Sequence, residues 1–216
     1  MNSPVASYSF FSAWDICAHQ GYRRYIARDL PKTPETKEQA WGNKVHAAID
    51  AYIKNGVVLP DDMPWEHFIK PIVAYGCASE KKLGITRNGR PCDFFADDVF
   101  LRGKLDAPIV VGEHALLLDW KTGKVREDPL ELEIGALLLQ AAYPLVRKIT
   151  GRYVWLKEGR LGQEHDCSNT LRTWNEVSAR MRNVEDSIKL NEFPKTPGPL
   201  CGWCPVLDCE HNRSKT

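Results

Sequence analysis

The feature that most constrains the fold of this chain is a predicted β-hairpin near its middle. Two apolar runs, 107–111 and 115–118, are separated by Gly112-Glu113. A Gly-X pair between such runs is typical of a two-residue type II′ turn, because glycine accepts the positive φ that the turn requires. With these two residues as the loop, we predict that Val111 pairs with His114.

Counting back along this register places Asp106 opposite Asp119. Side chains alternate along a strand, so Asp119 and Lys121 point to the same face of the hairpin. Asp106, opposite Asp119 on the neighbouring strand, points to this face as well. Opposed residues lie about 4.5–5.5 Å apart at Cβ, where like charges are destabilising. Lys121 supplies only one positive charge, and hard oxygen ligands suit Mg²⁺ or Mn²⁺. The alternative is a surface hairpin with an ordinary ion pair, or a register shifted by a bulge at Pro108.

Asp106, Asp119-x-Lys121 and the following Thr122-Gly123 resemble the PD-(D/E)XK nuclease signature in its RecB-like form. The resemblance implies an α/β fold with an αβββαβ restriction-endonuclease-like core, in which helices flank a mixed central sheet. It also implies that Asp106, Asp119 and Lys121 are catalytic, that both aspartates bind the metal, and that the backbone carbonyl of Trp120 is a further ligand.

Composition narrows the class of protein. The chain has 216 residues, 43% of them hydrophobic, and a formal net charge of +1, so nucleic-acid binding must depend on local basic patches. No signal peptide pattern and no run long enough to span a bilayer is found. We expect a cytoplasmic protein, bacterial or phage-encoded, that does not bind membranes.

Residues 8–29 have helical apolar spacing that starts near a serine. The segment carries a basic–aromatic patch suited to phosphates and unstacked bases, although a solvated helix face is an equal alternative. It resembles the N-terminal segment of RecB-like nucleases. The predicted DNA-binding residues of this patch are Arg23, Arg24 and Arg28.

A helix over 35–54 is predicted next, with Gly42 and His46 on its inner side. A histidine there is by itself weak evidence for a ligand. The spacing Gly42-x-x-x-His46 resembles the helix before the catalytic strands of RecB-like nucleases, which implies that His46 binds the metal. Imidazole suits Mn²⁺ better than Mg²⁺.

The remaining pattern predicts alternating elements without internal repeats. A loop is expected at 60–64, and a helix over 130–148 places Gln140, Tyr143 and Arg147 on one face. Gln140-x-x-Tyr143 resembles the RecB-family element lining the DNA groove, which implies catalytic roles for both residues and DNA binding by Arg147. The other predicted elements are helices over 65–82 and 170–190 and strands over 90–96, 99–111, a segment ending at 121, 151–157 and 160–167.

Seven cysteines, an odd number, argue against a complete disulfide framework. Cys201, Cys204 and Cys209 form a C-x2-C-x4-C metal-binding spacing on a Pro/Gly-rich loop, one ligand short of a tetrahedral site, and we expect Cys17 to be the fourth. This arrangement resembles iron–sulphur RecB-like nucleases, including the CRISPR-adaptation nucleases, and implies a 4Fe–4S cluster. Zn²⁺, with Cys17 or His211 completing the set, is the alternative. The remaining cysteines, Cys77, Cys92 and Cys167, are expected to be small buried hydrophobes.

Taken together, these features predict a single nuclease domain over 1–216, with its core at about 36–170. In this prediction the metal cluster joins 1–30 to 192–216. We expect a metal-dependent DNA exonuclease acting on single-stranded ends, similar to phage RecB-like exonucleases. The alternatives are a DNA-binding subunit with weak turnover and a zinc-stabilised adaptor, and a protein partner or second copy of the chain stays open.

Overall fold

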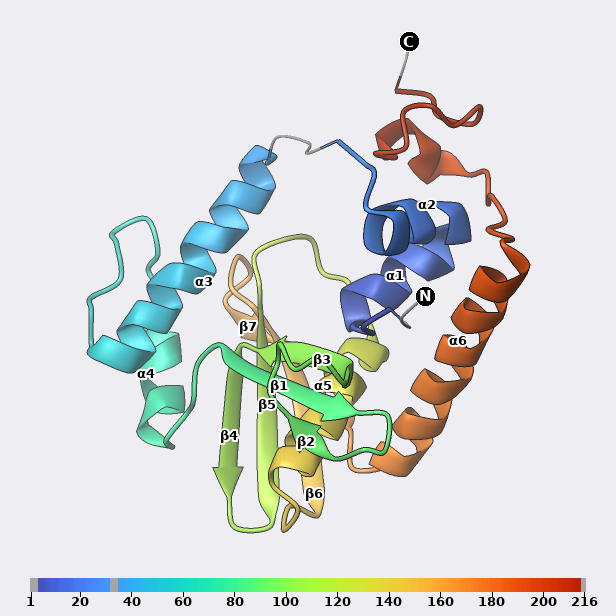
Figure 1. Cartoon of the computed structure of the whole chain (residues 1–216). Coiled ribbons are helices and arrows are strands. Elements are labelled where there is room, and N and C mark those ends of the chain that lie inside the picture. The colour runs from blue at the N-terminus through green and yellow to red at the C-terminus, as the bar shows by residue number, and fades with distance from the viewer. Residues whose placement is uncertain (1–3, 32–34, 215–216) are drawn as a thin grey trace. The chain divides into compact units, whose positions relative to one another are not determined.

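The computed structural model describes residues 4–31 and 35–214 (Figure 1). The chain forms two compact units, Glu35–Trp174 and the combination of Met1–Pro34 with Asn175–Thr216. Residues 1–3 and 215–216, the outermost parts of the predicted single domain, lie outside the described residues. That these units act as one nuclease domain stays a prediction.

The strands all belong to the unit Glu35–Trp174 and form two ladders. One sheet has the order β2-β1-β3, and the other has the order β4-β5-β6-β7, with β8 pairing β6. The strands β4 and β5 are antiparallel, whereas β5 and β6 are parallel, so the second sheet is mixed. The strands are β1 (Lys81–Thr86), β2 (Pro91–Cys92), β3 (Val99–Leu105), β4 (Ala107–Val111), β5 (His114–Lys121), β6 (Lys148–Trp155), β7 (Arg160–Leu161) and β8 (His165–Asp166).

The predicted hairpin register is confirmed. Val111 pairs with His114, and the ladder continues without a shift to Ala107 and Leu118. Gly112 has a φ of 58°, the left-handed conformation that glycine adopts without strain. Pro108 lies within the ladder and introduces no bulge. Asp106 therefore directly precedes β4, and Asp119 directly follows Leu118, the last partner in the ladder.

Helices cover both faces of the mixed sheet. Helix α5 (Pro129–Ala142) packs against β1, β3, β5 and β6, and its Gly135 lies close to Leu117. On the other face, α3 (Lys37–Asn55) and α4 (Glu66–Ala74) share a core with the even-numbered residues of β5. Alternation along β5 thus directs Leu117, Asp119 and Lys121 towards α5. The core of the face that α3 and α4 cover contains Val45, Ile49, Leu59, Met63, Ile69, Ala107, Ile109, Leu118, Trp120, Val154 and Leu156.

Local signals set the ends of these helices. Thr36 caps α3 and forms a reciprocal capping box with Gln39, and Gly56 ends the helix in the left-handed conformation. Asp128 caps α5 by accepting a hydrogen bond from the Leu130 backbone N–H, and Pro129 occupies the first turn. The order α3, α4, β1–β5, α5, β6 contains the predicted αβββαβ core.

The predicted helix over 65–82 is wrong after Ala74. The chain leaves α4 through Gly76, whose φ is 76°, and Lys81–Thr86 then forms β1. The apolar spacing of α4 runs on into the alternating pattern of β1, so periodicity alone merges the two elements. The long-range ladder with β3 decides between them.

The predicted strand boundaries also need correction. Only Pro91–Cys92 of 90–96 pairs, because the acidic segment after it turns. The predicted strand 99–111 divides at Asp106, where the chain passes from one sheet to the other. The strand expected over 151–157 is shifted to 148–155. The segment 160–167 forms two short strands instead of one.

The predicted helix over 130–148 ends early. Tyr143 is the C-cap of α5, because Pro144 lacks an N–H and disfavours a helical conformation for the residue before it. The strand β6 begins at Lys148. Arg147 is therefore in a loop, and its predicted place on the Gln140 face of the helix is wrong.

The other unit is helical and contains the cysteine-rich segment. The predicted helix over 8–29 is interrupted at Cys17, whose backbone is extended. Its thiol lies 4.0 Å from the Pro194 carbonyl oxygen, a tertiary contact that helical spacing cannot reveal. No described helix is both long and apolar enough to cross a bilayer. The elements are α1 (Tyr8–Ile16), α2 (Ala18–Tyr22), the π-helix η1 (Arg23–Ala27), the Asn175–Leu190 part of α6 (Thr170–Leu190, as predicted) and the 3₁₀ helix η2 (Pro199–Trp203).

Candidate active site and cysteine cavity

Three side chains from separate elements form a candidate metal site. One ligand atom each of His46, Glu80 and Asp106 lies within 4.8 Å of the others. His46 comes from α3, Glu80 directly precedes β1, and Asp106 stands between β3 and β4. One imidazole and two carboxylates provide hard oxygen and borderline nitrogen donors, a set that suits Mn²⁺ and Mg²⁺.

His46 is held by three oxygen atoms. Its Nε2 lies 3.1 Å from the Trp120 carbonyl oxygen, and its Nδ1 lies 3.4 Å from Asp106 Oδ1 and 3.5 Å from Glu80 Oε1. Burial lowers the pKa of His46, but hydrogen bonds to Asp106 and Glu80 outweigh it and raise the pKa to about 10. The imidazole is therefore protonated at neutral pH in the metal-free protein and donates to the Trp120 carbonyl.

Glu80 is the member of this cluster that the sequence analysis missed. Its φ is 52°, an unusual value for a residue other than glycine and one that often accompanies functional sites. The backbone N–H of Glu80 donates to the Asp106 carbonyl oxygen at 3.0 Å, and Lys104 pairs with the Glu80 carboxylate. Burial raises the pKa of Glu80, but His46 and Lys104 lower it overall. No local pattern marks Glu80, because its position depends on the pairing of β1 with β3.

Asp106 is the buried carboxylate of the cluster, with 7% of its surface exposed. Its Oδ2 accepts a hydrogen bond from the Trp120 N–H at 3.0 Å, which fixes the carboxylate at the end of β5. The carbonyl of Trp120, predicted as a metal ligand, points to His46 from the same peptide segment. The structure thus brings Asp106, His46 and Trp120 together.

Asp119 and Lys121 form the second half of the candidate site. The Lys121 Nζ lies 2.7 Å from Asp119 Oδ2 and 2.9 Å from Glu131 Oε2. Burial, Asp106 and Glu131 raise the pKa of Asp119 well above its ordinary value. Burial lowers the pKa of Lys121, but both carboxylates outweigh it and raise this pKa overall. Lys121 is consequently a cation throughout the neutral range.

Glu131 is a second residue that the sequence analysis did not single out. It lies in the first turn of α5, and the Tyr153 hydroxyl is 3.0 Å from its Oε2 and 2.7 Å from the Asp128 carbonyl. The ring centroid of Tyr153 is 5.1 Å from Lys121 Nζ. The parallel pairing of β5 with β6 places Asp119 beside Tyr153. An acidic residue in the helix after the Asp-x-Lys strand is the signal that would have identified Glu131.

Gly42 allows α3 to approach the turn after β5. A Cβ atom at this position would lie 3.4 Å from Thr122 Oγ1, in ordinary van der Waals contact with this turn.

Gln140 and Tyr143 lie at the opposite end of α5 from Glu131. Gln140 comes nine residues after Glu131 in the helix, a rise of about 13.5 Å. Gln140 Nε2 donates to the Val146 carbonyl at 3.1 Å, and Gln140 Oε1 accepts from the Thr170 hydroxyl. The structure does not bring Gln140 to Lys121, and the predicted catalytic roles of Gln140 and Tyr143 stay predictions.

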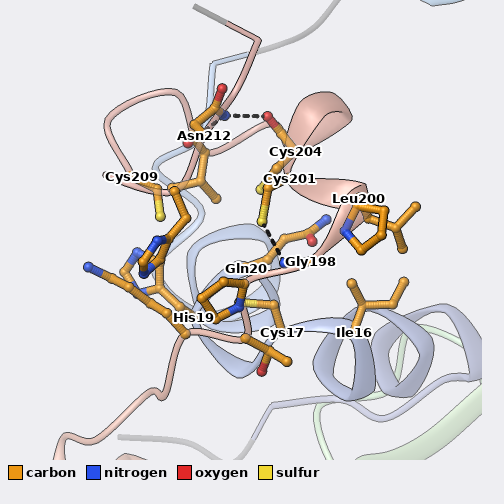
Figure 2. A pocket seen from close by; sticks show the side chains of 16 residues that line it. Ile16, Cys17, His19, Gln20, Gly198, Leu200, Cys201, Cys204, Cys209 and Asn212 are labelled. Carbon is orange, nitrogen blue, oxygen red and sulfur yellow. Dashed lines mark hydrogen bonds between the residues drawn. The ribbon is translucent and has the colours of Figure 1, made fainter.

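The four predicted cluster cysteines line one cavity (Figure 2). The cavity has a volume of about 180 Å³, and Cys17, Cys201, Cys204 and Cys209 all contribute to its wall. Burial raises the pKa of the Cys204 thiol, and the neighbouring thiols of the other three raise it further. His211, the alternative ligand, lines the same cavity. Of the other cysteines, Cys167 is buried as predicted, whereas Cys77 and Cys92 are half-buried.

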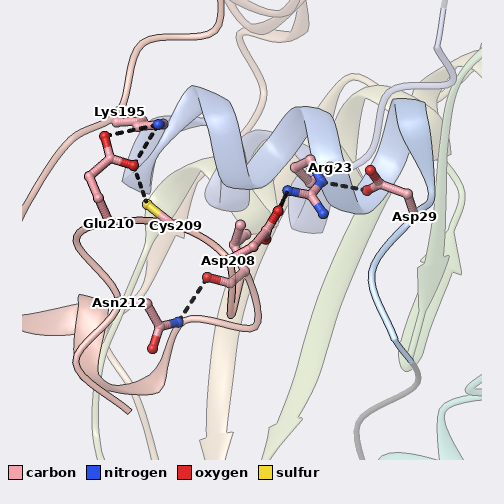
Figure 3. Close-up of polar contacts among 8 residues, drawn as sticks. Arg23, Asp29, Lys195, Asp208, Cys209, Glu210 and Asn212 are labelled. Atoms are coloured by element: carbon pink, nitrogen blue, oxygen red, sulfur yellow. Dashed lines mark hydrogen bonds and ion pairs between the residues drawn. The ribbon is translucent and has the colours of Figure 1, made fainter. Parts of the chain in front are cut away.

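The residues directly before and after Cys209, Asp208 and Glu210, both form ion pairs (Figure 3). Arg23 pairs with Asp208 at 3.0 Å and with Asp29 at 2.6 Å. Lys195 pairs with Glu210 at 2.7 Å, and this contact lowers the pKa of Glu210 to about 2. The guanidinium of Arg23, predicted to bind DNA, is thus already neutralised by two carboxylates.

The other two arginines of the predicted patch are exposed. The Arg24 guanidinium lies 5.5 Å from the Tyr25 ring centroid, and Arg28 Nε donates to the Tyr25 carbonyl at 3.3 Å. Arg28 has a φ of 53° and caps η1. Contact of Arg24 and Arg28 with DNA stays a prediction.

Comparison with known proteins adds independent evidence. Residues 65–209 match the family model of the PD-(D/E)XK nuclease superfamily. The chain is 28% identical over 119 residues to the Gene 69 protein of Mycobacterium phage L5 and 25% identical over 134 residues to the Gene 69 protein of Mycobacterium phage D29. These alignments cover 54% and 58% of this chain but 41% and 50% of the phage proteins, so the chain spans about half the length of the curated relatives it matches.

A solved structure shares the fold. The crystal structure of SSO0001 aligns with a TM-score of 0.55 at 15% sequence identity, covering 98% of this chain and 88% of that chain. At this identity the likeness concerns the fold alone. The family match itself includes Asp106, Asp119, Lys121 and Glu131 but begins after His46.

Proposed function

Because this chain belongs to the PD-(D/E)XK nuclease superfamily, we propose that it is a Mg²⁺- or Mn²⁺-dependent deoxyribonuclease of the RecB-like type that degrades single-stranded DNA from free ends. The observation that carries this proposal is the Asp119–Lys121 pair at the end of β5, facing the His46–Glu80–Asp106 cluster. An ordinary surface ion pair would not account for three further ionisable groups gathered at the same strand end.

The donor set fits a divalent cation. His46, Asp106 and Asp119 with the Trp120 carbonyl would hold it, and Glu80 would be a further ligand. Asp119 supports this assignment, because its pKa is raised by burial and by neighbouring carboxylates. A bound cation would relieve that repulsion. When bound, the ion supplies Lewis acidity and lowers the pKa of its water.

Lys121 acts as a cation in this proposal. Its ammonium is held between Asp119 and Glu131 at hydrogen-bond distance, so its orientation is fixed before the substrate arrives. A positioned charge stabilises the negative charge that develops on the phosphoryl oxygens during hydrolysis. Because the pKa of Lys121 is raised, it orients water by donating a hydrogen bond and does not remove a proton.

The preference for single strands is supported by exposed cations next to aromatic rings. Arg24 beside Tyr25 is one such place, and aromatic rings next to cations bind unstacked bases and the phosphate backbone. A DNA-binding subunit without turnover would retain these groups, but it would not need the half-buried Asp119–Lys121 pair.

We also propose that the cysteine cavity holds a 4Fe–4S cluster. Four thiols line its wall, the number such a cluster requires. One Zn²⁺ is the alternative, because it also binds four thiolates. Iron, sulfide and zinc analysis of anaerobically purified protein distinguishes the two.

The proposed activity is tested on end-labelled linear and covalently closed circular single strands, each with and without Mn²⁺. We expect metal-dependent loss of the linear strand and survival of the circle. Asp119→Asn should abolish cleavage while DNA binding survives. Asp61→Asn, which changes an exposed loop carboxylate, is the matched control and should cleave as the wild type does. Rapid cutting of the circle would overturn the requirement for an end, and cleavage by Asp119→Asn at the wild-type rate would overturn the site.

A further inference from the structure

The face of the β1–β3 ladder that turns away from α5 carries an unusual group of cations. On the inner face, Leu83, Ile85 and Leu101 are buried, and Gly103 lies close to Leu138 of α5. Because side chains alternate along strands, the residues between them, Lys82, Arg102 and Lys104, are on the opposite face.

Two of these cations are directly opposed. Lys82 pairs with Lys104 in the antiparallel register, and like charges in such a position destabilise the ladder. Glu80 neutralises Lys104. Within residues 4–31 and 35–214, neither Lys82 nor Arg102 forms an ion pair with a carboxylate. A bound anion would reduce the repulsion between these cations, in the same way that a bound metal ion would reduce the repulsion between Asp106 and Asp119.

An exposed aromatic ring lies among the unpaired cations. Phe95 is 72% exposed, and its ring centroid is 5.4 Å from Lys82 Nζ and 5.6 Å from the Arg102 guanidinium carbon. Phe94 meets Phe95 edge to face at 4.9 Å, and Arg102 donates to the Phe94 carbonyl at 3.2 Å. Phe94 and Arg102 thus support Phe95 from one side and leave most of its ring accessible.

The same strands connect this group to the candidate active site. Lys104 contacts Glu80 of the metal cluster. Arg102 lies two residues before Lys104 in β3, about 7 Å from it along the strand. A strand of nucleic acid with a phosphate at the cluster would reach Phe95 within a few nucleotides. The acidic residues of the adjoining turn, Asp93, Asp97 and Asp98, disfavour a broad anionic surface such as a membrane and leave a narrow basic path.

We propose that Lys82, Phe95, Arg102 and Lys104 form a stacking platform for a single-stranded nucleic acid, with one base on Phe95 and the flanking phosphates on the cations. The proposal rests on the proposed nuclease function and extends it. It names a substrate-positioning surface next to the cleavage site. An aromatic ring accepts any base, because every base presents a π face. The platform therefore selects unstacked strands without reading their sequence.

Binding to a fluorescent single-stranded oligonucleotide tests the platform in the Asp119→Asn background, where cleavage does not interfere. Phe95→Ala should weaken binding about tenfold, the usual loss for one stacked base, and Phe95→Trp should restore it. The matched control is Tyr75→Ala, because Tyr75 is 71% exposed on the same unit. Lys82→Ala should reduce the salt dependence of binding by about 0.7 in log–log slope, whereas exposed Lys70→Ala should not change it.

A set of oligonucleotides with one abasic site each separates stacking from a general loss of folding. With Phe95 present, an abasic site at one particular position of the oligonucleotide should weaken binding about tenfold. In Phe95→Ala, an abasic site at this same position should no longer weaken binding. The platform is overturned if Phe95→Ala binds normally or if the abasic profile is unchanged in that variant. These results are independent of turnover. If the wild type cleaves DNA but the abasic profile is the same with and without Phe95, only the platform is wrong. If the wild type cleaves no DNA but Phe95→Ala changes the abasic profile as expected, only the nuclease function is wrong.

Discussion

The Lys121 ammonium lies 2.9 Å from Glu131 Oε2, so the helix that follows β5 supplies its second counter-ion. Asp119 supplies the first at 2.7 Å. If Asp119 binds a divalent cation, Glu131 becomes the principal anionic partner of Lys121. Helix α5 would then hold Lys121 charged and in place during the reaction.

Glu131→Gln should therefore slow cleavage about ten- to hundredfold while leaving DNA affinity unchanged, because a positioned charge is lost and no substrate contact is removed. Single-turnover rates and binding measured on the same oligonucleotide check this. Glu133→Gln is the control, since Glu133 lies in the same helix but pairs with Arg172. Equal rates for Glu131→Gln and the wild type would show that Asp119 alone positions Lys121.

Asp119→Asn should change stability in a pH-dependent way. The folded-state pKa of Asp119 is raised above 3.8, so its ionisation destabilises the fold increasingly as the pH rises from about 4 through the raised pKa. In metal-free buffer, Asp119→Asn should thus gain melting temperature relative to the wild type between pH 4 and neutral pH. Mn²⁺ at one hundred times its Kd should add about 2.7 kcal/mol to the wild type and far less to this variant. A variant that melts below the wild type at every pH would contradict the repulsion argument.

Metal affinity should increase with pH because of His46. The His46 pKa of about 10 means that an ion must displace a proton, so Mn²⁺ affinity should rise by about one log unit per pH unit between pH 7 and 9. In the metal-free state, the stability that protonated His46 contributes is complete below about 6.5 and is lost as the pH rises through about 10.

Calorimetry in buffers of different ionisation enthalpy measures this proton release. The wild type should release about one proton per ion at pH 8, and His46→Gln should release fewer and bind more weakly. His67→Gln, which changes an exposed histidine of α4, serves as the control. Identical proton release by the wild type and His46→Gln would exclude His46 as a ligand.

Cys17→Ser should lower iron and sulfide content, expose residues 192–214 to protease and reduce the melting temperature. The wall of the cavity combines Cys17 with three cysteines near the other end of the sequence. A cluster bound by all four would link residues far apart in the sequence, and closing so long a loop costs conformational entropy. The link would therefore stabilise the folded state relative to the unfolded chain. Cys92→Ser, outside the cavity, should retain full cluster content. Full content and wild-type melting in Cys17→Ser would remove Cys17 from the ligand set.

The hairpin was predictable because its information is local. Gly112-Glu113 sets the turn, the turn sets the register, and the register runs to the pair Ala107–Leu118, directly next to Asp106 and Asp119. The Asp119–Lys121 pair follows from alternation along one strand. Thr170–Leu190 was likewise predictable, because a long amphipathic helix without internal proline or glycine has no competing local signal.

Glu80 was not predictable because its role depends on distant partners. It precedes β1, whose strand conformation is set by pairing with β3, and its backbone N–H bonds to Asp106. The break at Cys17 has the same origin, since its contact is with Pro194. In both cases a contact with a residue far away in the sequence determines the local structure. The spacing of residues within one segment carries no information about such a contact.

The division of the chain has a consequence for the order in which the protein is made. Glu35–Trp174 is continuous, whereas the other unit joins residues before 35 to residues after 174. Domains generally fold as units during synthesis, so the carboxylate site can form while the cysteine loop is still inside the ribosome. Cys17 emerges early, well before Cys201, Cys204 and Cys209. If these four thiols hold the proposed cluster, its assembly would be a late event in the maturation of this protein.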